Sequence, residues 1–383
     1  MRALGSGIQW SSLEVICCMG RFAERTMRKI AYLLLFLLLP AFAAEHTIAV
    51  VGLVHSHVWG HLKEVLPGQP VRLVGVAETE PELVAEAEKR GVPANLVFAD
   101  WKKMIDQQKP EIVWAFVENN RHREIVEYCA PRKIHVLFEK PLASNYKEAL
   151  AIRDLARKHG IYVMTNYQMA WWPANYTARK LAASGAVGQV WRLHGIVGHG
   201  GPGGPTGLNK YFFNWLTDPV KNGGGALVDF GCYNALWSLW YLGRPETVYA
   251  QSNQLRPKEF PKVEDNADII LNYKQGVAIL EGSWDLPYGF QDLEVFGLGG
   301  GIHMSDGEVT LRKSGQREAQ TMPVTALPPE ASTPVAAMIH SIESKTEPQG
   351  LTSLDMNIQV VEILDAAKES LKTGRAVRLA ARK

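Results

Sequence analysis

The sequence carries no strong excess of charge of either sign. Its 41 lysine and arginine residues are balanced by 39 aspartate and glutamate residues, which leaves a net charge of +2 at pH 7. No basic block stands out either, so the sequence argues against a nucleic-acid partner. Internal repeats and long low-complexity tracts are also missing. The 383 residues, 46% of them hydrophobic, are enough for two domains with separate cores.

Cysteine is scarce, with four residues in the chain. Cys17 and Cys18 precede the mature protein predicted below, which leaves Cys129 and Cys232. Two thiols in an exported chain can pair, and the sequence alone does not decide whether they do. We expect both to be buried and free.

The chain also lacks a hydrophobic run long enough for a comfortable membrane span. The apolar run at residues 30–39 follows two basic residues and precedes the small-residue stretch A-F-A, which is the layout of a secretory signal peptide. We therefore predict that residues 1–44 are an over-extended start plus a signal peptide, cut after Ala43. The mature protein is expected to be exported, periplasmic or extracellular, without a stable membrane span.

Short apolar runs alternate with helical patterns in the first part of the mature chain. We predict helices between strands at residues 47–51, 71–77, 96–98, 111–117, 134–138 and 161–165. Continuous apolar strands that alternate with helices indicate a parallel sheet covered on both faces. Residues 45–165 are therefore expected to form a Rossmann-like doubly wound domain of the α/β class, with ligands at the carboxyl ends of its strands.

The pattern changes after Asn166. A helix at residues 173–184 leads to a long strand at 189–199 and a Gly/Pro-rich loop. Later strands follow one another without helices between them, at residues 246–254, 265–273, 276–284, 292–300 and 301–313. This succession predicts a large, mainly antiparallel sheet. We expect residues 166–383 to form an α+β substrate and oligomerisation domain, closed by a helix at 355–373.

Three segments carry side chains suited to chemistry, and the first is F-E-K-P-L-A. It places Glu139 and Lys140 at the carboxyl end of the fifth strand, facing the ligand crevice. Pro141 fixes its own φ and restrains Lys140. Beside an oxidised nicotinamide, Lys140 should lose basicity, because a like charge disfavours its protonated form, and it could then shuttle a proton. The alternative is a solvated Glu-Lys turn.

The second segment is N-G-G-G-A-L-V-D-F-G-C-Y. Asp229 and Tyr233 lie four residues apart in it, so they share one face of a helix. Asn222 and three glycines precede that helix, and glycines allow a backbone to approach a ligand closely. The alternative is that the glycines form only a turn and that Tyr233 packs in the core.

The third segment, T-N-Y-Q-M-A-W-W, follows the last strand of the first domain. Asn166, Tyr167 and Trp172 lie in it, where the chain crosses to the second domain. A polar amide among aromatic rings suits a sugar, because rings stack on its faces while its hydroxyls need partners. We predict that these residues and Asn222 bind substrate; packing between the domains is the alternative.

Together these motifs resemble those of the glucose–fructose oxidoreductase, inositol dehydrogenase and rhizopine catabolism family (Gfo/Idh/MocA). The resemblance covers almost all of the mature chain. It implies NAD or NADP, a two-domain fold and a small sugar or polyol as substrate. It also implies that Lys140 of the E-K-P motif is catalytic, and that Asp229 and Tyr233 are the aspartate and the tyrosine of the family's D-x-G-x-x-x-[HY] helix.

The loop after the first strand departs from the dinucleotide pattern G-x-G-x-x-G. Gly52 is kept, whereas Val54 and His57 take the next two glycine places. We predict that His55, Ser56 and His57 donate N–H groups to phosphate at a helix N-terminus. Glu78, at the end of the second strand, is placed to accept ribose hydroxyls and to repel a 2′-phosphate, so NAD is favoured over NADP. Glu139 and Lys140 are expected to line the same cofactor site.

A metal site is the alternative interpretation of this loop. Two histidines spaced as His55 and His57 are found in metal hydrolases. Such a site needs further ligands at later strand ends, and neither E-K-P-L-A nor M-T-N-Y-Q offers a convincing one. We therefore expect no metal.

Three functions compete. The first is an exported NAD(P)-dependent oxidoreductase that acts on a secondary hydroxyl, in which Lys140 and Tyr233 share the proton while Asp229 orients the hydroxyl or holds Lys140. The second is an NAD-dependent glycosidase that oxidises the sugar transiently and consumes no net NAD. The third is a non-catalytic sugar-binding protein on the same scaffold. A homo-oligomer through the second sheet is also expected.

Overall fold

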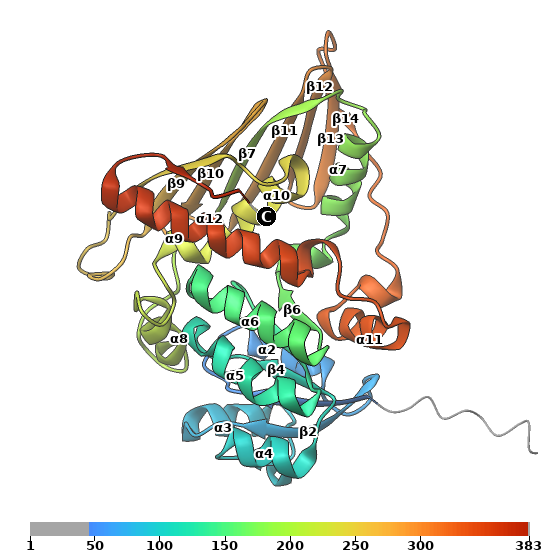
Figure 1. The fold of residues 1–383 in the computed structure, drawn as a ribbon, viewed down its shortest axis with the longest axis vertical. Coiled ribbons are helices and arrows are strands. Elements are labelled where there is room, and N and C mark those ends of the chain that lie inside the picture. The colour runs from blue at the N-terminus through green and yellow to red at the C-terminus, as the bar shows by residue number, and fades with distance from the viewer. Residues whose placement is uncertain (1–45, 382–383) are drawn as a thin grey trace, which may run out of the picture. The chain divides into compact units, whose positions relative to one another are not determined.

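The computed structural model describes residues 46–381, which Figure 1 shows as two sheets with their covering helices. The predicted signal peptide, residues 1–44, lies outside the described residues. Among the helices of residues 46–381, none is long and apolar enough to cross a membrane. Cys129 and Cys232 are buried and free, as the sequence predicted.

The first sheet holds six strands in the order β3-β2-β1-β4-β5-β6, and every neighbouring pair is parallel. Its elements are β1 (His46–Val51), α2 (Val58–His61), β2 (Val71–Ala77), α3 (Pro81–Lys89), β3 (Val97–Phe98), α4 (Trp101–Gln108), β4 (Ile112–Ala115), α5 (His122–Cys129), β5 (His135–Glu139), α6 (Tyr146–His159) and β6 (Val163–Asn166). Helices α4, α5 and α6 pack apolar side chains on one face of the sheet, and α2 and α3 pack on the other. Both faces are covered, so the strands are apolar throughout. The predicted doubly wound parallel sheet is confirmed.

The second sheet holds nine strands in the order β14-β13-β12-β11-β7-β10-β9-β8-β15. They are β7 (Val190–Gly198), β8 (Thr247–Asn253), β9 (Asn266–Tyr273), β10 (Gly276–Ser283), β11 (Phe290–Gly297), β12 (Gly300–Ser305), β13 (Glu308–Lys313), β14 (Gln320–Thr321) and β15 (Val377–Arg378). Its pairings are antiparallel except for the parallel pair β7 and β10. The prediction of a mainly antiparallel sheet is therefore confirmed.

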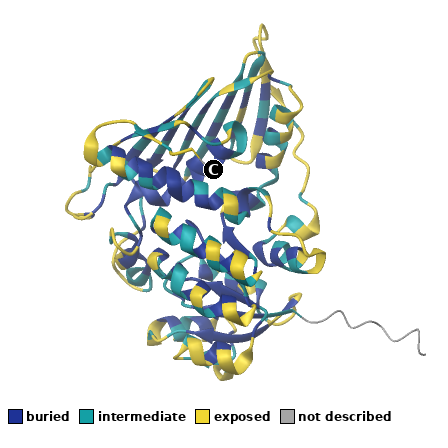
Figure 2. Cartoon of the chain, in the orientation of Figure 1, coloured by how far each residue is buried: buried dark blue, intermediate teal, exposed yellow. Residues whose placement is uncertain are grey.

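Helices cover one face of this second sheet (Figure 1). They are α7 (Pro173–Ala183), α9 (Ala226–Asp229), α10 (Gly231–Leu242) and α12 (Leu354–Thr373). Alternate strand residues, such as Ala278 and Leu280 of β10, are buried under them, and Figure 2 shows this core as dark blue between the helices and the sheet. Helix α12 also gives Ile358 and Val361 to the core of the first sheet. One helix thus ties the two sheets together.

The structure differs from the sequence prediction in several elements, among them the short strands β14 and β15, which were not predicted. Two helices, α8 (Asn209–Leu216) and α11 (Pro334–Ser344), lie where no helix was predicted. The single strand predicted at residues 301–313 is the hairpin of β12 and β13. Asp306 and Gly307 form its turn with φ values of 49° and 81°, and two positive φ values match the twist of a two-residue hairpin loop. A D-G pair between apolar runs is the signal that the prediction overlooked.

Candidate active site at the carboxyl end of strand β5

A buried ion pair lies directly after β5. The ammonium of Lys140 donates a hydrogen bond to a carboxylate oxygen of Asp229, and Trp284 Nε1 donates to the other oxygen at 2.9 Å. Lys140 and Asp229 are each 4% exposed. Lys140 and Asp229, which belong to two different predicted motifs, are thus in contact although 89 residues of sequence separate them.

Each partner of this pair stabilises the charged form of the other. Burial opposes the charge on Lys140, but the carboxylate of Asp229, together with smaller contributions from Tyr233 and Cys232, raises the pKa of Lys140. Burial likewise opposes the charge on Asp229, but Lys140 and the Trp284 hydrogen bond lower the pKa of Asp229. Lys140 is therefore held protonated in the protein without cofactor, whereas the sequence argument expected it to lose basicity beside a nicotinamide.

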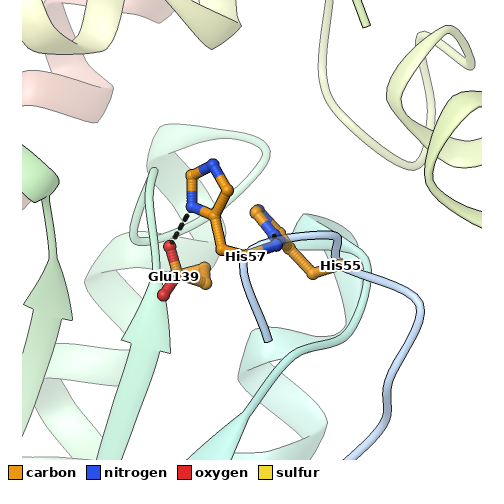
Figure 3. Close-up of side chains that lie close together, drawn as sticks. All are labelled: His55, His57 and Glu139. Atoms are coloured by element: carbon orange, nitrogen blue, oxygen red, sulfur yellow. Dashed lines mark hydrogen bonds and ion pairs between the residues drawn. The ribbon is translucent and has the colours of Figure 1, made fainter. Parts of the chain in front are cut away.

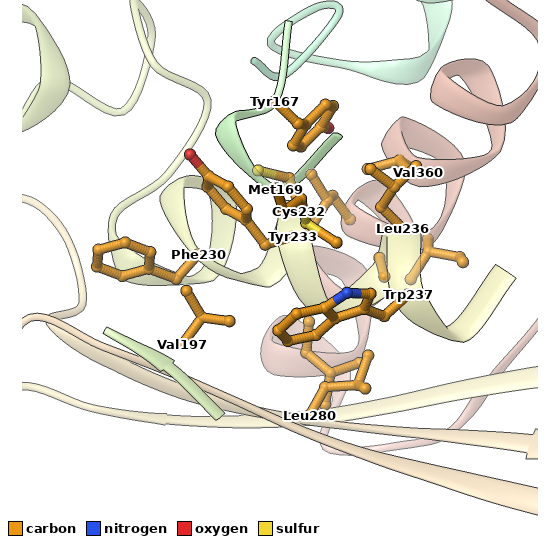
Figure 4. Packing of buried hydrophobic residues seen from close by; sticks show 14 of the residues in the cluster. Tyr167, Met169, Val197, Phe230, Cys232, Tyr233, Leu236, Trp237, Leu280 and Val360 are labelled. Carbon is orange, nitrogen blue, oxygen red and sulfur yellow. The ribbon is translucent and has the colours of Figure 1, made fainter. Parts of the chain in front are cut away.

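Tyr233 lies next to the pair, but not on the same helix as Asp229 as the sequence predicted, because α9 ends at Asp229 and α10 begins at Gly231. Its ring centroid is 5.0 Å from Lys140 Nζ, and its ring meets that of Tyr167 edge-on at 5.3 Å (Figure 4). Among residues 46–381 its hydroxyl has no hydrogen-bond partner. Burial raises the pKa of Tyr233, and the charge of Lys140 offsets only part of that effect. Tyr233 therefore offers an O–H donor rather than a phenolate base.

Glu139 faces the loop after β1 rather than solvent. Its Oε2 contacts His57 Nδ1 at 2.8 Å (Figure 3). Its Oε1 accepts from Asn166 Nδ2 at 2.7 Å. Asn166 in turn contacts His61 Nε2 at 3.0 Å and accepts from Trp171 Nε1 at 2.7 Å. Burial opposes the charge on Glu139, but the contacts of this carboxylate, of which that with His57 contributes most, lower the pKa of Glu139. A buried carboxylate thus organises the side chains at the carboxyl ends of β1, β5 and β6.

His55 is buried, with 1% of its surface exposed, because α8 packs over it. Its ring lies 5.1 Å from that of Phe212 and 5.3 Å from that of Trp215, both in α8. Its Nδ1 accepts from the backbone N–H of His57 at 3.2 Å. Burial, with a smaller contribution from the charge of His57, lowers the pKa of His55 well below its usual value. His55 is therefore a neutral imidazole.

Some of the N–H groups of this loop that were predicted to bind phosphate donate hydrogen bonds within the protein instead. The N–H of His55 donates to Phe116 O at 3.2 Å, and the N–H of His57 donates to His55. Helix α2 has only four residues, so its N-terminus is a poor anion site. The side chain of His55 is buried and that of His57 is bound to Glu139. Ser56, half-buried, is the member of the predicted trio that remains available.

Gly52 and Glu78 sit where a dinucleotide loop needs them. Gly52 has φ 77°, and an added Cβ would lie 2.5 Å from Val117 Cγ1, so this turn requires glycine. Glu78 accepts from the N–H of Leu53 at 2.7 Å and from that of Thr79 at 2.7 Å. A carboxylate has about four acceptor positions. With Glu80 N–H as its third donor at 3.1 Å, Glu78 keeps room for one more, such as a ribose hydroxyl.

The residues predicted to bind substrate separate into two groups. Asn166, Tyr167 and Asn222 are fully buried, and Asn222 Oδ1 accepts from Asn119 Nδ2 at 2.7 Å. These three buried side chains pack inside the protein where the two domains meet. That they contact substrate stays a prediction. Trp172, by contrast, lines a cavity of about 470 Å³.

Neither Lys140 nor Asp229 lines that cavity, but two residues that were not predicted from the sequence lie between it and the ion pair. Phe230 and His199 line it, and the Phe230 ring lies 5.9 Å from Lys140 Nζ. Burial lowers the pKa of His199, and the carboxylate of Asp229 opposes that shift. His199 follows β7 directly, and a histidine at a strand end before a glycine-rich loop was the available signal.

The triple glycine approaches protein backbone rather than a ligand. A Cβ on Gly225 would lie 1.9 Å from Glu264 O, and a Cβ on Gly223 would lie 2.4 Å from Ser144 O. Glu264 Oε1 also accepts from Gly225 N–H at 2.7 Å. On the side where a Cβ would point, both glycines are needed for close packing against other segments of the protein. That a ligand approaches these glycines stays a prediction.

The residues present fit a nicotinamide dinucleotide at its ribose and at its reactive end. Gly52 and Glu78 lie at the carboxyl ends of β1 and β2, and Lys140 lies at that of β5, along the crevice that this sheet order creates. The histidines of the loop are the part that departs from the usual donor set.

Two family models match the chain. The oxidoreductase family with an NAD-binding Rossmann fold matches residues 46–167, and the GFO/IDH/MocA C-terminal domain matches residues 176–303. A D-xylose 1-dehydrogenase (NADP(+)) of Haloferax volcanii is 26% identical over 310 residues, which cover 78% of this chain and 89% of that protein. A levoglucosan dehydrogenase of Pseudarthrobacter phenanthrenivorans is 30% identical over 204 residues, covering 47% of this chain and 48% of that one.

Solved structures agree with this assignment at the level of the fold. The aldose-aldose oxidoreductase of Caulobacter crescentus, complexed with glycerol, has a TM-score of 0.74 at 22% identity and covers 88% of this chain and 100% of its own. A levoglucosan dehydrogenase in complex with NADH and levoglucosan has a TM-score of 0.71 at 21% identity, covering 87% and 99%. With both family models matched in order along the chain, this protein belongs to the Gfo/Idh/MocA family of NAD-binding oxidoreductases.

Proposed function

We propose that the protein oxidises a secondary hydroxyl of a sugar or polyol, or reduces the corresponding carbonyl, with a nicotinamide dinucleotide. The observation that carries this proposal is the buried Lys140–Asp229 pair at the end of β5, beside the cavity that Trp172 and His199 line. Relatives named for dehydrogenation of D-xylose and of levoglucosan support a sugar substrate.

Each residue of the site has a defined task. The bound dinucleotide supplies or accepts the hydride. In carbonyl reduction, protonated Lys140 donates a proton to the substrate oxygen, and Asp229 keeps the ammonium in place. In alcohol oxidation, the Lys140 ammonium first releases its proton to solvent, and the neutral amine then accepts the proton of the substrate hydroxyl. Tyr233 donates its O–H to the same substrate oxygen.

NAD is the proposed dinucleotide. Glu78 holds the loop through Leu53 N–H and keeps one acceptor position free, and its charge would repel a 2′-phosphate. The names of the relatives point both ways, since the xylose dehydrogenase is named for NADP(+) and the levoglucosan dehydrogenase was solved with NADH.

The test is a substrate screen with the purified protein. Pentoses, hexoses and polyols are each incubated with NAD or NADP, and the absorbance of the reduced nicotinamide is followed. With the best substrate, Lys140→Ala and Tyr233→Phe should each lower turnover about 10²–10⁴-fold, the range of general acid–base catalysis. Lys103→Ala, which removes an exposed lysine of α4, is the matched control. Unchanged turnover in both site variants would overturn the assignment.

Export is a further part of the proposal, and the signal-peptide layout of residues 27–44 supports it. Cell fractionation tests it. The protein should be found outside the cytoplasm in a shortened form, and deletion of residues 27–44 should retain it inside. Full-length protein in the cytoplasm would contradict export. A homo-oligomer through the second sheet stays a prediction that the molar mass in solution will decide.

A further inference from the structure

The altered glycine loop brings three metal-ligating side chains together. His55 and His57 from the loop and Glu139 from the end of β5 each offer a ligand atom, and these atoms lie within 4.8 Å of one another (Figure 3). The sequence argument found no convincing third ligand in E-K-P-L-A, and it overlooked Glu139. Two imidazoles and a carboxylate are the ligand set of several catalytic zinc sites, which keep the fourth position open.

We propose that His55, His57 and Glu139 bind a divalent transition-metal ion of the Zn²⁺ type. A tetrahedral ion with bonds of about 2.0–2.1 Å keeps its ligand atoms roughly 3.3 Å apart. His57 Nδ1 and Glu139 Oε2 are 2.8 Å apart, so they need to separate by only a fraction of an ångström. The ion then replaces the hydrogen bond between His57 Nδ1 and Glu139 Oε2.

His55 is prepared for the same role. Its ring is buried and is held by Phe212 and Trp215. Its Nδ1 faces His57, from whose N–H it accepts a hydrogen bond at 3.2 Å. That contact is long, so its loss to a metal bond costs little.

The surroundings support the ligands and leave one side open. Asn166 donates to the second oxygen of Glu139 at 2.7 Å and so fixes the orientation of the carboxylate, as outer-shell partners of metal ligands do. Side-chain exposure is 1% for Glu139 and 21% for His57, so the fourth position opens on the side of His57, into the crevice. The nearby charge of Lys140 does not oppose a cation strongly, because Asp229 neutralises it. An oxygen ligand, such as a phosphate or hydroxyl oxygen, suits that open position.

The proposal concerns metal binding alone, so it stands or falls independently of the oxidoreductase function. Tag-free protein is stripped with a chelator, dialysed and titrated with Co²⁺, whose visible spectrum reports coordination by nitrogen and oxygen. The expected result is a single Co²⁺ per chain, displaced by Zn²⁺. Titration of the same stripped protein with NAD reports separately on the dinucleotide.

Variants localise the ion. Glu139→Gln and His57→Gln should each weaken Co²⁺ binding by more than the about 10–100-fold that is typical when an outer-shell partner is lost, and Asn166→Ala should weaken it within that range. His303→Gln is the matched control, because it removes another histidine that contacts a carboxylate, that of Asp292 at 2.6 Å. Circular dichroism shows that each variant is folded. No bound Co²⁺ in folded wild type, or wild-type binding in both Glu139→Gln and His57→Gln, would overturn the proposal.

Discussion

Replacement of Asp229 by asparagine should destabilise the protein strongly through one defined cause. Asparagine keeps the shape of the side chain and an oxygen that can accept from Trp284 Nε1, but it removes the charge that compensates Lys140. Both members of the pair are 4% exposed, so the remaining ammonium would be buried without a counter-charge. Breaking a buried pair by removing one partner costs about 3–5 kcal/mol. We expect a loss of that size in the free energy of unfolding at neutral pH.

The pH dependence gives the sign of the effect. In the wild type, folding raises the pKa of Lys140. The contribution of Lys140 to the free energy of unfolding is therefore complete below the pKa that it has in the unfolded chain. That contribution is lost only as the pH rises through the pKa that Lys140 has in the folded protein. Folding lowers the pKa of Asp229. The contribution of Asp229 to the free energy of unfolding is complete above its pKa in the unfolded chain, and it is lost as the pH falls through its pKa in the folded protein. The pair is thus intact across neutral pH. In Asp229→Asn, Lys140 keeps its hydrogen bond to the backbone oxygen of residue 229 at 3.2 Å but loses the compensating charge. Its pKa should therefore fall, and the variant should regain stability as the pH rises and the lysine loses its proton.

Urea unfolding of wild type and variant at several pH values measures both effects. Asp292→Asn is the matched control, because it removes a carboxylate that contacts His303 near the surface, and exposed pairs contribute about 0–1 kcal/mol. A loss in Asp229→Asn no larger than that in Asp292→Asn, and independent of pH, would show that the lysine is not held in the way described here.

Three further predictions follow from single contacts. Glu78→Ala should reduce the preference for NAD over NADP in a calorimetric titration, and an unchanged preference would mean that Glu78 does not meet the ribose. His57→Gly should not tighten NAD binding, because His57 is engaged by Glu139 rather than simply obstructing phosphate; a substantially tighter complex would show the reverse. Gly225→Ala should lower the thermal midpoint, since the added Cβ would lie 1.9 Å from Glu264 O, whereas Gly204→Ala, with open space around it, should lower it less.

The arrangement of the first sheet followed from the sequence because of a local property. Strands covered on both faces must be apolar wherever they are buried, and this pattern is visible in segments such as V-R-L-V-G-V-A of β2, in which the one charged residue, Arg72, is exposed. The Lys140–Asp229 pair was predictable for another reason, namely that its two motifs resemble those of a known family. Local pattern and motif were therefore enough to locate β5 and the reacting groups beside it.

The partners of individual side chains were decided by tertiary structure. His57 meets Glu139 across 82 residues of sequence, and no periodicity in either segment records that contact. Helix α8 follows a Gly/Pro-rich loop, and only its packing over His55 shows why this histidine is buried. The triple glycine is a further example. The sequence indicates that another group lies close to this backbone, but it does not indicate which group that is. Local patterns and motifs of the sequence thus indicated the sheets and the Lys140–Asp229 pair, whereas folding decided whether the loop histidines face phosphate, a carboxylate or a metal ion, since that depends on contacts between distant segments.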